Sequence, residues 1–248
     1  MGILDFISAE KRKEKRLERA IRSANNKFKP KDYRQVALSE VIESAKKGNQ
    51  EAIAGLIARF GVNAEPTTED EKEKEWVFDA LLEIGRPVLE PLKRTMRTAE
   101  GVNWAHRTLR GIVSEEEYKK ELLDVLSDFD TEYERNPDRK LQTIMALSEI
   151  DGDEISEALI RFLSDVDETV RFQTVSALAR HGQELAREPL LNTMCEDESI
   201  RIRNETIDAF CKLEWLVTGH KKKVESVLTP AYKLEKSGKI VKLGKYKE

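Results

Sequence analysis

Histidine side chains are the first candidates for chemistry in this chain. The three histidines, His106, His181 and His220, lie far apart, and none has a glutamate beside it. A zinc hydrolase helix needs two histidines four residues apart with an adjacent glutamate, so this chemistry is absent. The chain also contains no glycine-rich phosphate loop and no Gly-x-Ser-x-Gly turn of a serine hydrolase. We therefore predict no catalytic residue and no cofactor.

Clustered carboxylates and two cysteines are the other candidate groups. Asp151-Gly-Asp153-Glu154 begins like a calcium loop, but it lacks the bidentate glutamate that such a loop needs at its twelfth position. The spacing of Cys195 and Cys211 fits neither a zinc site nor a redox motif, and both occupy apolar helical positions. We predict no metal site and two buried, reduced thiols, as in a cytoplasmic protein.

The chain repeats itself with a period of about 31 residues. At that shift Gln142-Thr143 falls on Gln173-Thr174, and Ala146-Leu147 falls on Ala177-Leu178. At a shift of 30, the segment 167–171 falls on 197–201, and the match then continues at a shift of 32, with Thr174 on Thr206 and Ala177 on Ala209. A longer shift of 98 places Glu90-Pro91-Leu92 on Glu188-Pro189-Leu190, and about three short periods separate these copies. Self-similarity of this length is typical of a solenoid of stacked repeats.

Each repeat has the pattern of a helical hairpin. Ile155, Leu159, Phe162 and Leu163 recur at the spacing of one helical face, and Gly182 interrupts the pattern where a helix C-cap is expected. We predict an all-α fold, an α-solenoid of about six hairpins, with boundaries near 32–60, 69–97, 101–127, 137–163, 167–195 and 198–228.

The segment Asp167-Glu168-Thr169-Val170-Arg171, followed by Ala177-Leu178, resembles the Asp-x-x-Val-Arg…Ala-Leu core of HEAT repeats. It is most similar to the short repeats of phycobilisome lyases and of bacterial adaptor proteins. The resemblance is strong over 137–215 and moderate over 69–127, whereas the first hairpins rest on periodicity alone. It implies that the aspartate caps the first helix and that the arginine reaches a neighbouring repeat. This gives structural, inter-repeat roles to Asp167, Arg171, Asp197 and Arg201.

The two ends of the chain differ from the repeats. Residues 1–31 predict a basic amphipathic helix that caps the first hairpin, or that docks on an anionic membrane or in a partner's groove. Its candidate contacts are an apolar tip and the two basic residues that follow it: Ile3, Leu4, Phe6, Ile7, Lys11 and Arg12. Residues 229–248 alternate polar and apolar side chains about Ser237-Gly238, which predicts a basic β-hairpin. The solenoid itself is assigned to 32–228.

The charge is distributed unevenly along the chain. Residues 1–34 and 219–248 each carry a net charge of +6, so the segment between them carries −16 within a total of −4. A surface that binds duplex DNA needs an excess of Lys and Arg, so this segment argues against nucleic acid as a partner. It predicts instead a protein partner with a basic patch. Trp76 and Trp104 are expected either in the core between repeats or as exposed anchors for such a partner.

These observations predict a non-enzymatic, cytoplasmic scaffold that binds a protein on the concave face of its solenoid. Two other functions remain open at this point. One is a lyase-type or chaperone-like accessory that acts on a client protein, which rests on fold analogy. The other is a membrane-surface scaffold that is recruited by the N-terminal helix.

Overall fold

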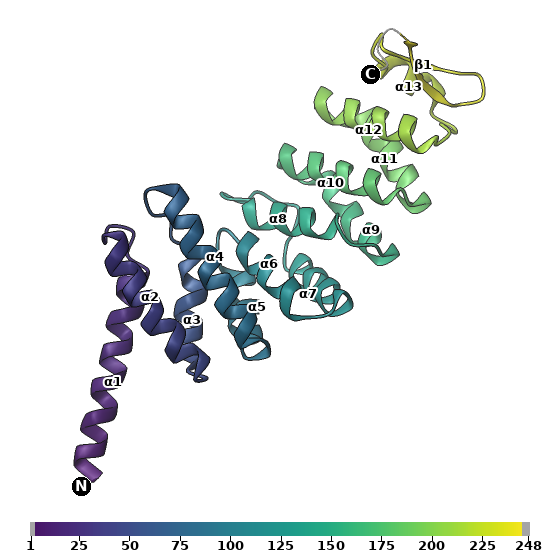
Figure 1. Cartoon of the computed structure of the whole chain (residues 1–248). Coiled ribbons are helices and arrows are strands. Elements are labelled where there is room, and N and C mark those ends of the chain that lie inside the picture. The colour runs from purple at the N-terminus through teal and green to yellow at the C-terminus, as the bar shows by residue number, and fades with distance from the viewer. Residues whose placement is uncertain (1–2, 245–248) are drawn as a thin grey trace. The chain divides into compact units, whose positions relative to one another are not determined.

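The chain folds almost entirely into α-helices. A computed structural model describes the backbone of residues 3–244 and the side chains of residues 10–244. Helices make up 71% of the model, and the described residues contain thirteen α-helices and one two-stranded antiparallel sheet (Figure 1). The all-α class and the small C-terminal hairpin are confirmed. The chain divides into two compact units, Met1–Tyr118 and Lys119–Glu248, and the helix α7 crosses from one to the other.

The first unit consists of antiparallel helices preceded by a long N-terminal helix. Its elements are α1 (Ile3–Ala24), α2 (Lys31–Lys46), α3 (Gln50–Arg59), α4 (Thr67–Ile84), η1 (Arg86–Val88), α5 (Leu89–Thr98), α6 (Asn103–Ile112) and the start of α7 (Glu115–Ser127). The described part of α1 packs against α2 and α3, as a capping helix does. Ala20 and Ala24 on α1 are buried in this contact.

Each hairpin of the first unit buries one face of both helices. In α3, Ile53, Leu56 and Ile57 are almost fully buried, because their spacing places them on one side of the helix. The side chain of Asn49 accepts a hydrogen bond from the Ala52 backbone N–H at 2.9 Å and so caps the start of α3. The apolar face and the cap together fix where this second helix begins and which side it presents to the core.

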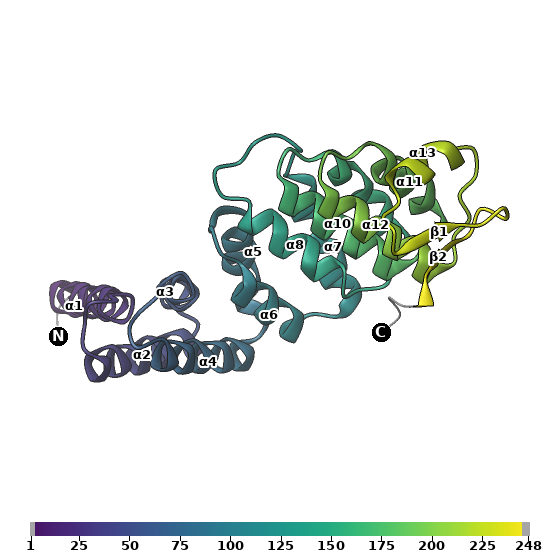
Figure 2. The same cartoon turned by 90° about the horizontal axis from the view of Figure 1, so that it is seen from above.

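The second unit repeats the hairpin in a regular way. Its elements are the rest of α7, α8 (Asp138–Leu147), α9 (Asp153–Leu159), η2 (Ile160–Ser164), α10 (Glu168–His181), η3 (Glu184–Ala186), α11 (Arg187–Glu196), α12 (Ile200–Leu213), α13 (Lys221–Val227), β1 (Tyr232–Leu234) and β2 (Ile240–Lys242). The first helices α8, α10 and α12 lie side by side, and the second helices form another layer (Figures 1 and 2). Within residues 3–244 the six predicted hairpins all appear.

The shift of 98 residues corresponds to a repeated local structure. Gly85 and Gly182, which are 97 residues apart, both end a first helix with positive φ, of 71° and 63°, and a 3₁₀ turn follows each of them. The second helices α5 and α11 then begin at the residue that directly follows the turn. In both, a threonine hydroxyl donates to the carbonyl of the proline four residues earlier, Thr95 to Pro91 and Thr193 to Pro189, each at 3.1 Å. The sequence match therefore reflects the same backbone path.

The C-terminal hairpin packs on the last first-layer helix. Tyr232 pairs with Lys242 and Leu234 with Ile240, and the hydroxyl of Tyr232 donates to Asp208 of α12. A Cβ on Gly238 (φ 97°) would lie 2.6 Å from the carbonyl oxygen of Val217, so only glycine fits this turn. The hairpin covers the end of the stack, where the next repeat would otherwise pack.

Candidate functional site

A ladder of buried ion pairs joins the first helices of the second unit. Lys140 of α8 reaches Asp165, which precedes α10, at 2.8 Å. Arg171 of α10 reaches Asp197, which precedes α12, also at 2.8 Å. All four side chains are buried, so each charge depends on its partner for solvation. Each rung thus links a first helix to the loop before the next one.

The aspartate of each rung also shapes its own loop. Asp165 accepts the backbone N–H of Asp167 at 2.9 Å, and Asp197 accepts that of Ser199 at 2.8 Å. The guanidinium of Arg171 donates to the backbone carbonyl of Asp165 as well, at 3.0 Å. One carboxylate therefore holds both the turn before a helix and the helix of the preceding repeat.

The predicted register of the repeat is wrong by two residues at the start of α12. Asp167 caps α10 by accepting the N–H groups of Thr169 and Val170, at 2.7 and 3.1 Å. Asp197 does not cap α12, because Ser199 accepts the N–H of Ile202 there, at 3.4 Å.

The equivalent of Arg171 is accordingly Arg203, at a shift of 32. Its guanidinium donates to the Asp197 carbonyl at 3.1 Å, as Arg171 does to the Asp165 carbonyl. Arg201 is exposed and lies over the ring of Phe172 in α10, 3.7 Å from its centroid. The shift of 30 rests on the motif Asp-Glu-x-x-Arg, which occurs at 167–171 and at 197–201. The shift of 32, which also aligns Thr174 with Thr206, matches residues along the whole helix. That longer match was the signal that identifies Arg203, and it also places Asp165 on Asp197, whereas Lys140 falls on Arg171 at the shift of 31.

An acidic groove of about 590 Å³ borders this ladder on the side of the second helices. It lies between η2 and α11, and its lining combines four carboxylates and one guanidinium with apolar and amide side chains: Asp165, Glu196, Asp197, Glu198, Arg171, Ile160, Leu163, Pro189 and Asn192. Such a lining offers carboxylate acceptors beside apolar side chains, which suits a cationic, partly apolar ligand.

The charges in the groove differ in how much they are already paired. The hydrogen bond from Arg171 to Asp197 raises the pKa of the guanidinium above its ordinary value, so Arg171 keeps its positive charge. Lys223 donates to Glu196 at 2.7 Å and lowers the pKa of that carboxyl. The side chain of Glu198 is 92% exposed and lies 3.8 Å from Arg171, which leaves most of its oxygen surface to solvent.

The two predicted aromatic contacts lie in the first unit. Trp104 stacks on Phe60 with 5.5 Å between ring centroids and 11° between planes, and Arg107 lies over its other face at 4.3 Å. Trp76 is on α4 and 39% exposed. In the second unit, Trp215 is buried against Phe210. Trp104 therefore packs between helices, and Trp76 keeps an exposed surface.

The predicted contacts near the N-terminus are described in part. The backbone of Ile3, Leu4, Phe6 and Ile7 belongs to α1, but their side chains lie outside the described residues. Lys11 and Arg12 are exposed on α1.

The remaining reactive groups are isolated from one another. Cys195 and Cys211 are free and half-buried, and burial raises the pKa of both thiols, that of Cys211 to about 11. Among residues 10–244, no three His, Cys, Asp or Glu side chains converge in a way that would hold a metal ion. No helix in the described part of the chain has the length and apolar character of a membrane span.

Comparison with known proteins agrees with this geometry. Residues 120–211, which contain both rungs of the ladder and the acidic groove, match the family of HEAT repeats. A search of curated proteins found no match for the chain. HEAT repeats generally serve as scaffolds for protein interactions, and the family match supports a HEAT-repeat protein.

Proposed function

We propose that the protein is a non-enzymatic adaptor that binds a basic segment of a partner protein in the acidic groove of its second unit. The observation that carries this proposal is the lining of the groove, which brings Glu196, Asp197 and Glu198 together with the apolar side chains of Leu163 and Pro189. A lysine or arginine of a partner would pair with these carboxylates, and its aliphatic stem would cover Leu163 and Pro189.

The ion-pair ladder supports the proposal, because a binding surface gains affinity when it is rigid before the partner arrives. In this proposal Asp167, Arg171 and Asp197 set the stagger between consecutive hairpins and so hold the groove in shape. Arg201 contributes through its contact with Phe172. The free thiols and the net charge of −16 between residues 35 and 218 fit a cytoplasmic protein whose partner is basic.

The proposal is tested by reversing charge in the groove of the full chain. Asn192 and Glu198 are exposed, and Glu198 approaches Arg171 of the ladder only at 3.8 Å, so we expect Asn192→Lys with Glu198→Lys to keep the fold. Tagged wild type and variant are expressed in the native cell, and co-purified proteins are quantified by mass spectrometry. We expect a small set of proteins with basic segments to be lost from the variant, and their recovery from wild type to fall as salt rises.

Glu132→Lys provides a control for added positive charge, since Glu132 is exposed in the loop before α8 and lies outside the groove. The control retains the same partners as wild type. If the groove variant also retains all of them, the acidic groove is not the binding site and the proposal is wrong. Partners that remain only with the N-terminal helix intact would instead favour recruitment through that helix.

A further inference from the structure

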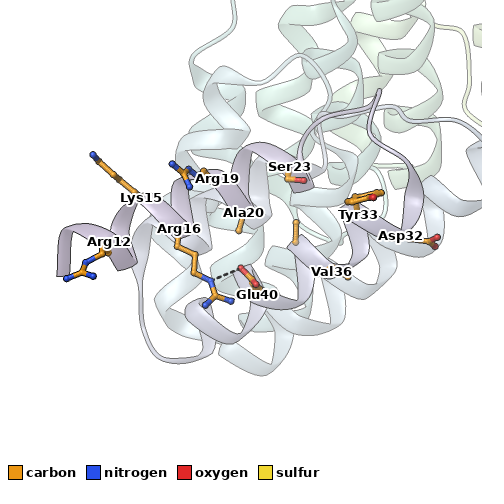
Figure 3. A pocket seen from close by; sticks show the side chains of 11 residues that line it. Arg12, Lys15, Arg16, Arg19, Ala20, Ser23, Asp32, Tyr33, Val36 and Glu40 are labelled. Carbon is orange, nitrogen blue, oxygen red and sulfur yellow. Dashed lines mark hydrogen bonds and ion pairs between the residues drawn. The ribbon is translucent and has the colours of Figure 1, made fainter. Parts of the chain in front are cut away.

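A second groove, of about 750 Å³, lies in the first unit between α1 and α2 (Figure 3). Its base is formed by small side chains, with Ala20 on α1 and Ala37 on α2 both buried. Arg16 crosses one end and pairs with Glu40 at 2.6 Å. Small residues at the base allow the backbone of a ligand to approach closely, since the distance between packed helices depends on the side chains at their contact.

One wall of this groove is a stripe of α2 that is only partly covered. Tyr33, Val36, Ala37 and Glu40 follow one another at the spacing of a single helical face, and Tyr33 and Val36 are each 65% exposed. In the second unit, α8 packs beside α10 and α10 beside α12. In the first unit α4 packs against a different face of α2, the one that carries Arg34. The helix α1 covers only part of the stripe.

The opposite wall is basic. Lys15 and Arg19 are exposed on α1, and neither has an ion-pair partner among residues 10–244. They are four residues apart, so their like charges repel each other on one face of the helix. A carboxylate placed between them would remove this repulsion. The surrounding segment, residues 1–34, carries a net charge of +6.

We propose that this groove binds an amphipathic helix of a partner protein, with an apolar stripe against Tyr33 and Val36 and acidic residues facing Lys15 and Arg19. A helix fits because the site is a trough between two helices whose base a flat lipid surface does not reach. Phosphates of a nucleic acid would find no partner on the apolar wall. The site goes beyond the proposed function, because it lies in the other unit and selects a partner of opposite charge.

The proposal is tested with a displayed library of 16-residue helical peptides in which acidic, neutral and basic sequences are equally represented. The full chain is the bait, and enriched peptides are titrated against purified protein. We expect enrichment of acidic peptides with apolar residues at i, i+3 or i+4 and i+7. Their affinity falls at least tenfold with Lys15→Glu and Arg19→Glu together, and at least tenfold with Val36→Asp.

Arg94→Glu with Lys120→Glu changes the net charge equally at exposed positions outside the groove and keeps the affinity of wild type. Circular dichroism establishes that each variant is folded. No enrichment, enrichment of basic peptides, or equal binding by the groove variants would each overturn the proposal. Two other results would also overturn it, because each would show that Lys15 and Arg19 bind something other than a helix. One is binding of phosphatidylglycerol vesicles that requires Lys15 and Arg19, without peptide enrichment. The other is dimer formation in sedimentation velocity that requires the same two residues.

Discussion

The two units of the chain bury charge in different ways. The first unit gathers five charged side chains into one irregular cluster between α2, α3 and α4: Arg34, Arg59, Asp70, Glu73 and Lys74. The second unit spreads its buried charges over the rungs Lys140–Asp165 and Arg171–Asp197, one per repeat. The cluster holds three helices together at one position, whereas each rung of the ladder fixes one hairpin relative to the next in the same way.

Sharing of partners distinguishes the cluster from the ladder. Glu73 accepts from Arg34 through both oxygens at 3.0 Å and from Arg59 at 2.8 Å. Burial alone raises the pKa of Asp70, but hydrogen bonds from Lys74 and Arg59 outweigh it and hold that pKa below its ordinary value. Loss of Arg59 therefore removes a donor from two buried carboxylates, whereas loss of one cation in the ladder removes a donor from a single carboxylate.

The largest expected effect is that of Arg59→Met. The guanidinium of Arg59 is fully buried and donates to Asp70, Glu73 and the Val62 carbonyl, so both carboxylates lose a partner. We expect the free energy of unfolding to fall by about 3–5 kcal/mol, measured by urea denaturation followed by circular dichroism. Lys46→Met, which removes an exposed pair with Glu83, changes it by less than about 1 kcal/mol. Equal effects of the two substitutions would contradict the comparison.

The first unit also buries a titratable group that nothing pairs. Neither ring nitrogen of His106 has a hydrogen-bond partner, and burial lowers its pKa from 6.5 to about 4. In the second unit, burial also lowers the pKa of His181, but a backbone hydrogen bond to Leu147 opposes the shift. The unfolded chain takes up the proton first, so the contribution of His106 to stability is complete above pH 6.5 and is lost as the pH falls through 4.

We expect this loss to reach about 3 kcal/mol between pH 7.5 and pH 4, at about 1.36 kcal/mol per pKa unit. His106→Leu removes it, so the difference in unfolding free energy between variant and wild type grows in favour of the variant as the pH falls. Urea denaturation at the two pH values measures that difference. A constant difference would show that His106 is solvated and not buried.

The next effect tests one rung of the ladder. Arg171→Met leaves the carboxylate of Asp197 buried with only the Ser199 N–H as donor, and we expect a loss of about 2–3 kcal/mol. Replacing Asp197 by Leu at the same time recovers part of that loss, because no unpaired charge remains. A double-mutant cycle in urea measures the coupling, and an additive result would show that the rung holds no interaction energy.

The two networks also differ in how well they could be predicted from the sequence. The hairpins and the terminal hairpin follow from periodicity and local turn chemistry, whereas the Asp167 cap was implied by the resemblance to HEAT repeats. The cluster lies in the part of the chain where the sequence repeat is weakest, so the repeat does not predict it. Arg34, however, occupies the same helical face as the apolar residues Ala37, Leu38 and Val41, and a charged residue on an apolar face indicates a buried ion pair.

The grooves were harder to predict. Counting charged residues predicts the sign of the net charge at each end and in the middle segment. The position of a groove depends instead on which side chains remain exposed after the helices pack. Glu196 and Glu198 look alike in sequence, yet one pairs with Lys223 and the other is solvated. Tyr33 and Val36 have the spacing of core residues, and only the position of α1 shows that they are uncovered.

The smallest expected effect decides between the two registers of the repeat. A shift of 30 makes Arg201 the equivalent of Arg171, which predicts a loss of about 2–3 kcal/mol for Arg201→Met. The structure places Arg201 at the surface, where its contact with the Phe172 ring is worth about 0.5–1 kcal/mol. Arg203→Met, which removes the hydrogen bond to the Asp197 carbonyl, costs about 1 kcal/mol and serves as the paired measurement. Urea midpoints that rank Arg171 first, with Arg203 and Arg201 both near 1 kcal/mol, support the shift of 32. A loss at Arg201 as large as that at Arg171 would restore the shift of 30 and contradict the position of Ser199 as the cap of α12.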